Sequence, residues 1–167
     1  MVEKDGLFKS KARHVGIFDF KETYRVLFEQ LVLEGYEVNE TSYKEIIGPN
    51  GTKEVSIFWD VTKKISDYFM FYINIWIHPL AMTSVEVDIE GVKQKINKGD
   101  LTIEFKCELW KDYQNQWESN NFVKSLRRYY DKHFIRERIE SYESKLISEF
   151  EAIVEFIKNW LVLTGRR

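Results

Sequence analysis

Residues 68–78, YFMFYINIWIH, decide the fold that the sequence predicts. At the two-residue period of a strand, one face of this stretch is apolar and the other is aromatic with polar tips. The apolar face carries Phe69, Phe71, Ile73, Ile75 and Ile77; the other face carries Tyr68, Met70, Tyr72, Asn74, Trp76 and His78. The first face is typical of a protein core. The second suits a surface that contacts another element, a ligand or a partner.

Length and composition indicate one globular domain. The chain has 167 residues, 44% of them hydrophobic and 16% aromatic, which disfavours intrinsic disorder. It carries 25 basic and 27 acidic residues, so the whole molecule has no strong attraction for nucleic acid or anionic lipid, although local patches can have one. With Cys107 as the single cysteine, we expect neither an internal disulfide nor a Cys-rich metal site.

The N-terminus and the hydropathy pattern bear on location. No run of about 18 apolar residues predicts a transmembrane helix, and the charged N-terminus lacks the apolar region of a secretory signal. A cytoplasmic protein is therefore expected. Residues 1–16 show little periodicity and are predicted to form a flexible N-terminal arm, with residues 17–167 as a single α+β domain.

A first helix is predicted to begin at Asp19. Asp19 and Glu22 match a capping box, and Gly35 is suited to end the helix in a left-handed conformation. Between them, apolar residues recur at helical spacing: Phe20, Tyr24, Leu27 and Leu31.

The middle of the chain has the alternation and turn signals of a strand meander. Strands are predicted over residues 43–47, 55–61, 68–78, 85–89, 92–96 and 101–109. Gly48-Pro49-Asn50-Gly51 is a turn signal, Pro79 is expected to end the central strand, and residues 97–100 are expected to form another turn. This pattern predicts five or six mostly antiparallel strands.

The C-terminal part is predicted to be helical. A helix capped by Asn120 or Asn121 carries Phe122, Leu126, Tyr129 or Tyr130, and Phe134. It continues into, or is followed by, a long helix whose apolar stripe is Ile139, Tyr142, Leu146, Phe150, Ile153, Ile157 and Trp160 or Leu161. The predicted fold is α+β, with an antiparallel meander sheet packed against the N-terminal helix and this long C-terminal helical region.

Three segments together resemble an uncharacterised family of small archaeal hypothetical proteins. They are IFDFKETYRVLFEQLVLEGYEV from residue 17, KISDYF from residue 64, and LWKDYQNQWESNNFVKSLRRYYDKHFIRERIESYESKL from residue 109. The resemblance implies an intracellular microbial protein. It implies no activity, because that family has no catalytic or binding residues to transfer.

No catalytic motif is present, so no enzyme activity and no cofactor are predicted. His14, His78 and His133 lack the spacing of a helical metal site, and the glycines form no phosphate loop. The sequence has no nucleophile-elbow motif. We expect Asp60 and Asn74 to be solvated or hydrogen-bonded strand residues. A metal site in which His78, Asp60 and a third ligand come together in the fold is a minor alternative.

The non-core face of the central strand is the first candidate surface. A small apolar ligand, with Asn74 and His78 as polar handles, is predicted to bind Phe58, Tyr68, Met70, Tyr72, Asn74, Trp76 and His78. The alternative is that the N-terminal arm or part of the first helix covers this face.

Two further surfaces come from charge patterns near the C-terminus. A basic ridge, predicted to contact RNA weakly or simply to be solvated, consists of Lys124, Arg127, Arg128, Lys132 and Arg136. The acidic segment that follows includes Glu140, Glu143 and Glu149. Pairing of basic with acidic segments around a two-fold axis predicts a homo-oligomer, unless the same charges pair within one chain. The sequence thus favours a non-catalytic binding protein that self-associates.

Overall fold

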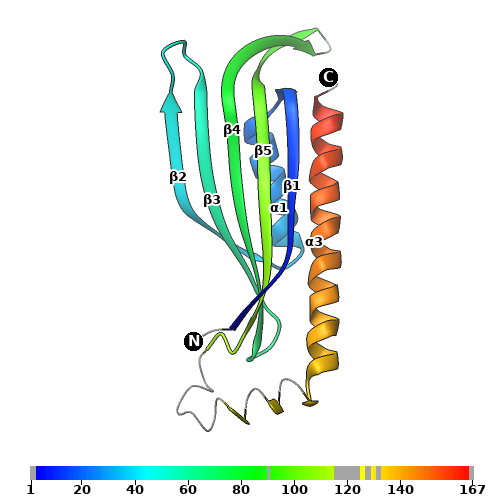
Figure 1. Ribbon diagram of the computed structural model, residues 1–167. Coiled ribbons are helices and arrows are strands. Elements are labelled where there is room, and N and C mark those ends of the chain that lie inside the picture. The colour runs from blue at the N-terminus through cyan, green and yellow to red at the C-terminus, as the bar shows by residue number, and fades with distance from the viewer. Residues whose placement is uncertain (1–2, 90, 115–124, 127–128, 131–132, 166–167) are drawn as a thin grey trace.

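The computed structural model describes residues 3–89, 91–114, 125–126, 129–130 and 133–165. Five strands, β1 (Glu3–Phe18), β2 (Glu37–Ile47), β3 (Lys53–Lys64), β4 (Phe69–Ile89) and β5 (Val92–Lys111), form one antiparallel sheet in the order β1-β5-β4-β3-β2. The helices are α1 (Phe20–Leu33) and α3 (Arg136–Thr164), as Figure 1 shows. The predicted α+β class with an antiparallel sheet is confirmed.

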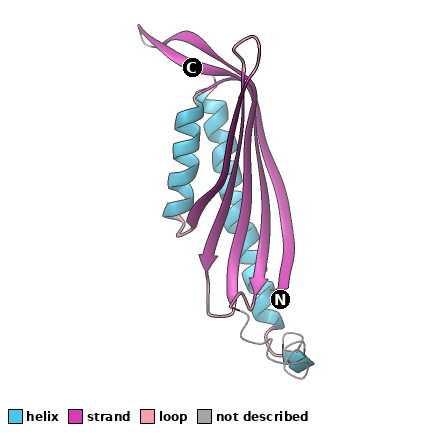
Figure 2. Cartoon of the chain, turned by 90° about the vertical axis from the view of Figure 1, so that its left-hand side faces the viewer, coloured by secondary structure: helices cyan, strands magenta, loops and turns pink. Residues whose placement is uncertain are grey.

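Both helices lie on the same face of the sheet (Figure 2). The core forms between them and the apolar sides of the strands, and the predicted apolar face of the central strand is fully enclosed: Phe69, Phe71, Ile73, Ile75 and Ile77 are buried. Trp59 of β3 is buried as well, and the ring of Tyr24 in α1 meets it edge-on at a centroid distance of 4.8 Å. Burial of this aromatic and aliphatic surface is the main stabilising contribution to the fold.

Helix α1 begins and ends as its sequence predicts. The Asp19 carboxylate accepts a hydrogen bond from the Glu22 backbone N–H at 2.9 Å, which satisfies a donor that the first turn leaves free. At the other end Gly35 has a φ of +82°, and the Tyr36 N–H donates to the Leu31 carbonyl at 3.0 Å. These are the bonds of a glycine-terminated helix.

Helix α3 packs its predicted stripe onto the sheet. Its buried residues are Leu146, Phe150, Ile153, Val154, Ile157 and Leu161. Phe150 contacts β1 and β5 through edge-to-face rings, 5.8 Å from Phe8 and 5.4 Å from Phe105. Within the described residues the C-terminal region supplies this one long helix. Much of the helix predicted to start at Asn120 or Asn121, including Phe122, lies outside them.

The prediction of a flexible arm over residues 1–16 is wrong, because β1 runs from Glu3 to Phe18 and pairs with β5 along its length. Core-facing and outward-facing residues alternate along this segment, but the many basic residues make this strand pattern hard to recognise in the sequence. Phe8, Ser10 and Ala12 oppose the core-facing Cys107, Phe105 and Ile103 of β5, whereas the residues between them are lysines that point to the other face.

Pro79 does not end the central strand, and residues 97–100 are not a turn. Strand β4 continues to Ile89 while β5 passes unbroken through Gly99. The pairing of β4 with β3 has an irregularity between Ile77 and Met82, so Pro79 lies where a ladder donor is not required. Ala81 there adopts a φ of +50°, and the bulge gives a long β4–β5 hairpin in place of separate short strands.

Candidate functional site

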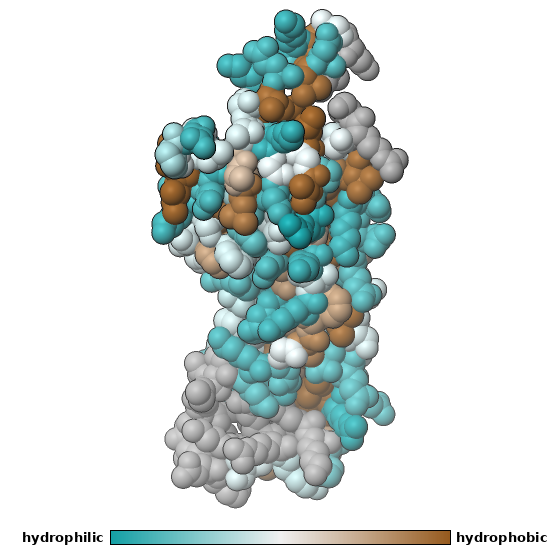
Figure 3. All heavy atoms as spheres, turned by 45° about the horizontal axis from the view of Figure 1, so that its top comes forward, coloured by the Kyte–Doolittle hydropathy of each residue, from teal (hydrophilic) through white to brown (hydrophobic). Residues whose placement is uncertain are grey.

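The sheet face opposite the helices is not covered by any element that the structure describes (Figures 1 and 2). We call it the outer face. The expectation that the N-terminal segment or the first helix covers it is wrong, since β1 is an edge strand within the sheet and α1 lies on the core face. In the view of Figure 3, hydrophobic residues form separate spots within a largely hydrophilic surface. The surface is therefore amphipathic and not one apolar cup.

Three rings form a stacked ladder on the outer face. Phe58 of β3 stacks on Trp76 of β4 at 5.4 Å with an interplanar angle of 6°, and Trp76 stacks on His78 at 3.9 Å. The indole N–H of Trp76 donates to the Ser56 hydroxyl at 2.8 Å. These contacts hold the Trp76 ring in one orientation before any ligand arrives.

A second group lies further along β4. Tyr72 stacks on Trp110 at 4.4 Å, and its hydroxyl donates to Asp60 Oδ1 at 2.6 Å. Asn74 Nδ2 donates to the same oxygen at 3.0 Å. Burial, reinforced by the hydrogen bond to Asp60 and its negative charge, raises the pKa of Tyr72 to about 12. Asn74 thus has one amide donor engaged while its carbonyl oxygen can still accept a hydrogen bond.

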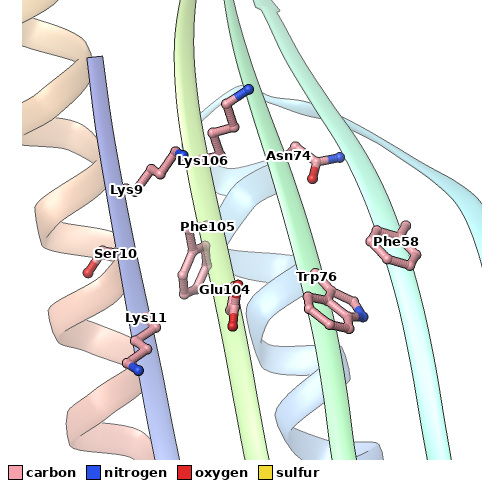
Figure 4. A pocket seen from close by; sticks show the side chains of 9 residues that line it. All are labelled: Lys9, Ser10, Lys11, Phe58, Asn74, Trp76, Glu104, Phe105 and Lys106. Atoms are coloured by element: carbon pink, nitrogen blue, oxygen red, sulfur yellow. The ribbon is translucent and has the colours of Figure 1, made fainter. Parts of the chain in front are cut away.

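A hollow of about 580 Å³ lies beside the ring ladder, and Figure 4 shows its walls. Aromatic side chains come from β3 and β4, and lysines come from β1 and β5. The lining residues are Lys9, Ser10, Lys11, Phe58, Asn74, Trp76, Glu104, Phe105 and Lys106. The volume lies within the range of roughly 300–1,000 Å³ that small-molecule sites occupy.

The structure places the predicted ligand residues in different surroundings. Phe58, Asn74 and Trp76 line the hollow, while Tyr72 and His78 lie next to it on the same face. Two predicted residues do not contribute: Met70 is buried, and Tyr68 precedes β4 and lines a separate hollow with Ile135 and Tyr142.

The cationic side of the hollow was not predicted. Lys9 and Lys11 project from β1, whereas the sequence predicts a flexible arm for these residues. A signal was available: basic residues alternate with Phe8, Ser10 and Ala12 at strand period. The structure records no ion pair for Lys9 or Lys11 with any residue that it describes.

The other charges at the hollow have partners nearby. Lys106 Nζ lies 2.6 Å from the Glu108 carboxylate. Glu104 Oε1 lies 3.6 Å from His78 Nε2, a nitrogen that is inaccessible to solvent and has no hydrogen-bond partner among the residues that the structure describes. For Glu108, the effect of burial is outweighed by hydrogen bonds from Lys106 and Trp110, so its pKa lies below the ordinary value.

The described residues contain no group of three or more His, Cys, Asp or Glu side chains that could hold a metal ion. Asp60, a ligand with His78 in the minor metal-site alternative, instead accepts hydrogen bonds from Tyr72 and Asn74. Cys107 is buried on the core face, and burial raises the pKa of its thiol. It is therefore poorly suited to act as a nucleophile.

Most of the basic ridge lies outside the described residues: Lys124, Arg127, Arg128 and Lys132. The remaining member, Arg136, donates to Glu140 one turn later in α3 at 2.9 Å. RNA contact through this ridge stays a prediction.

The acidic residues assigned to self-association have contacts within the chain. Glu140 pairs with Arg136, and Glu149 accepts hydrogen bonds from Lys63 at 2.9 Å and from the Tyr36 hydroxyl at 3.0 Å. Glu143 is partly buried; burial, and then the negative charge of Asp5, raise its pKa. Glu140 thus pairs with a basic-ridge residue of its own chain, whereas the partners of Glu149 lie outside that ridge. Self-association stays a prediction.

Among the described residues, neither helix combines the length and the apolar character needed to cross a membrane. Comparison with known proteins yields no match to a family model, to a curated protein or to a solved structure.

Proposed function

We propose that this protein is a non-catalytic binding protein, which holds a small ligand with a planar apolar body in the hollow of its outer face. The observation that carries the proposal is the preorganised Trp76, which is held by ring contacts with Phe58 and His78 and by a hydrogen bond to Ser56, at the wall of a hollow of about 580 Å³. A rigid aromatic wall favours binding because little side-chain freedom is lost when a ligand packs against it.

The lining favours binding over chemistry. No nucleophile is paired with a base among the described residues of the hollow, and Asn74 offers one amide group that can orient a polar substituent of the ligand. Because the hollow is open to solvent, the ligand can enter and leave without a change in the fold.

The proposal is tested with the neutral fluorophore N-phenylnaphthylamine, whose emission rises in an apolar site. We expect saturable binding to the wild-type protein and a loss of about tenfold in affinity in Trp76→Ala, since the variant removes most of a stacking surface. Trp110→Ala is the matched control, because Trp110 is on the same face but does not line the hollow. Equal binding by the wild type and Trp76→Ala, with both folded, would contradict the proposal.

Self-association through α3 is a second candidate, favoured by one observation. Phe156 and Leu163, seven residues apart on α3, are 39% and 66% exposed, and residues at this spacing lie on the same side of a helix. A second copy packing its α3 against these side chains would bury them. Light scattering of the wild type should then give the dimer mass, and Leu163→Glu the monomer mass. A monomeric wild type at high concentration removes this candidate.

A further inference from the structure

If the hollow is the ligand site proposed above, its lining also indicates the charge of the ligand. We infer that the ligand is an anion: Lys9 and Lys11 of β1 bind its carboxylate, sulfonate or phosphate group while its planar body lies against Trp76.

The register of the strands sets the distance between the two contacts. Lys9 and Lys11 oppose Lys106 and Glu104 of β5, and these oppose Asn74 and Trp76 of β4. The lysines and the aromatic wall are thus two strand spacings apart, about 10 Å in a sheet. That span is close to the length of a two-ring aromatic body with an acidic substituent, so one small molecule can reach both sides.

Positive charges outnumber negative charges around the hollow. Three ammonium groups and one carboxylate line it. Lys106 is engaged by Glu108, and the one lining carboxylate, Glu104, lies beside His78. Lys9 and Lys11 are the two lining cations for which no ion pair with a described residue is recorded. Two neighbouring cations on one strand repel each other, and a bound anion relieves that repulsion.

The same strand argues for a small anion over a nucleic-acid strand. The other cations on the outer face of β1 are engaged: the Lys4 ammonium lies 4.1 Å from the centre of the Trp110 ring, and Arg13 donates to both Asp100 oxygens at 3.0 and 2.6 Å. Along β1, the outer-face cations for which no partner is recorded among the described residues are therefore the two at the hollow. A polyanion needs a track of several phosphate contacts for comparable affinity.

The test uses two fluorophores with nearly the same aromatic body. Anilinonaphthalenesulfonate carries a sulfonate, and N-phenylnaphthylamine is neutral. We expect the anionic probe to bind the wild type about tenfold more tightly at low salt, because each charge-assisted hydrogen bond adds to the stacking contact. In Lys9→Gln/Lys11→Gln this preference should vanish while the neutral probe binds as before. Lys93→Gln/Lys95→Gln, which removes two lysines from the distant part of the β4–β5 hairpin, is the matched control.

The outcomes separate the two proposals. If both probes bind equally well to the wild type and Trp76→Ala weakens both, the ligand site stands and its anion preference is refuted. If Trp76→Ala weakens neither probe, the ligand site itself is refuted, and this inference falls with it. If a single-stranded oligonucleotide of ten bases binds through Lys9 and Lys11 far more tightly than the anionic probe, the assignment to a small ligand is overturned.

Discussion

Glu149 of α3 forms polar contacts with β3 and with Tyr36, which directly precedes β2. Its carboxylate accepts hydrogen bonds from Lys63 at the end of β3 and from the Tyr36 hydroxyl, and the Lys63 ammonium lies 4.8 Å from the centre of the Tyr36 ring. Tyr36 is buried, and burial together with the Glu149 charge raises the pKa of its hydroxyl. The hydroxyl therefore stays protonated and remains a donor across the physiological pH range.

Replacing this donor should cost stability. In Tyr36→Phe the Glu149 carboxylate loses one hydrogen bond in a partly buried place, and we expect the free energy of unfolding to fall by about 1 kcal/mol. Tyr43→Phe is the control, since Tyr43 donates to Glu45 at an exposed position. Urea denaturation measures both. A change in the control as large as that in Tyr36→Phe would contradict the role assigned to burial.

Tyr72 should make the stability depend on pH in alkaline solution. Its pKa is raised to about 12 in the fold, mainly by burial, whereas a tyrosine in the unfolded chain ionises near pH 10. Its contribution to stability is complete below about pH 10 and is lost as the pH rises toward 12, because the unfolded chain releases its proton first. Urea denaturation across this interval should show a shallower decline in Tyr72→Phe than in the wild type. Identical declines would show that Tyr72 is not buried as described.

At the scale of elements, regular strand and helix periods were sufficient to predict α1, β3, α3 and the buried face of β4 from sequence. Strand β1 was missed because Lys4, Lys9, Lys11 and Arg13 hide a short apolar alternation that only the neighbouring β5 makes stable. Because β1 was not predicted, its lysines Lys9 and Lys11 were not predicted to line the hollow. Local turn signals also misled at Pro79 and Gly99, where a bulge shared by three strands replaces the expected strand end and turn.

The bulge gives a prediction for Gly99. A Cβ added there would lie 2.8 Å from the Leu80 carbonyl oxygen and 3.1 Å from Met82 Cα, both of them backbone atoms. We expect Gly99→Ala to lower the free energy of unfolding by about 1–3 kcal/mol through this overpacking. Gly6→Ala is the matched control: no atom lies within 4 Å of its added Cβ, so the variant should be as stable as the wild type or slightly more stable. Thermal denaturation of the two variants compares them directly.

At the scale of the whole molecule, the two faces of the sheet have separate roles. The core face is occupied by α1 and α3 and accounts for stability, so changes there should unfold the protein. The outer face is supported by that core, and its aromatic side chains Phe58, Trp76 and Tyr72 are already held by stacking and hydrogen bonds. Variants of outer-face residues that line the hollow should therefore alter binding with little effect on the fold.

Amide chemical-shift mapping tests this separation most directly. An isotope-labelled sample is titrated with anilinonaphthalenesulfonate, and the backbone shifts are followed residue by residue. We predict that the largest shifts fall on Lys9, Lys11, Phe58, Asn74 and Trp76, which lie on three different strands but surround one hollow. Shifts concentrated instead on α1 or α3, with these five residues unchanged, would contradict the assignment of binding to the outer face.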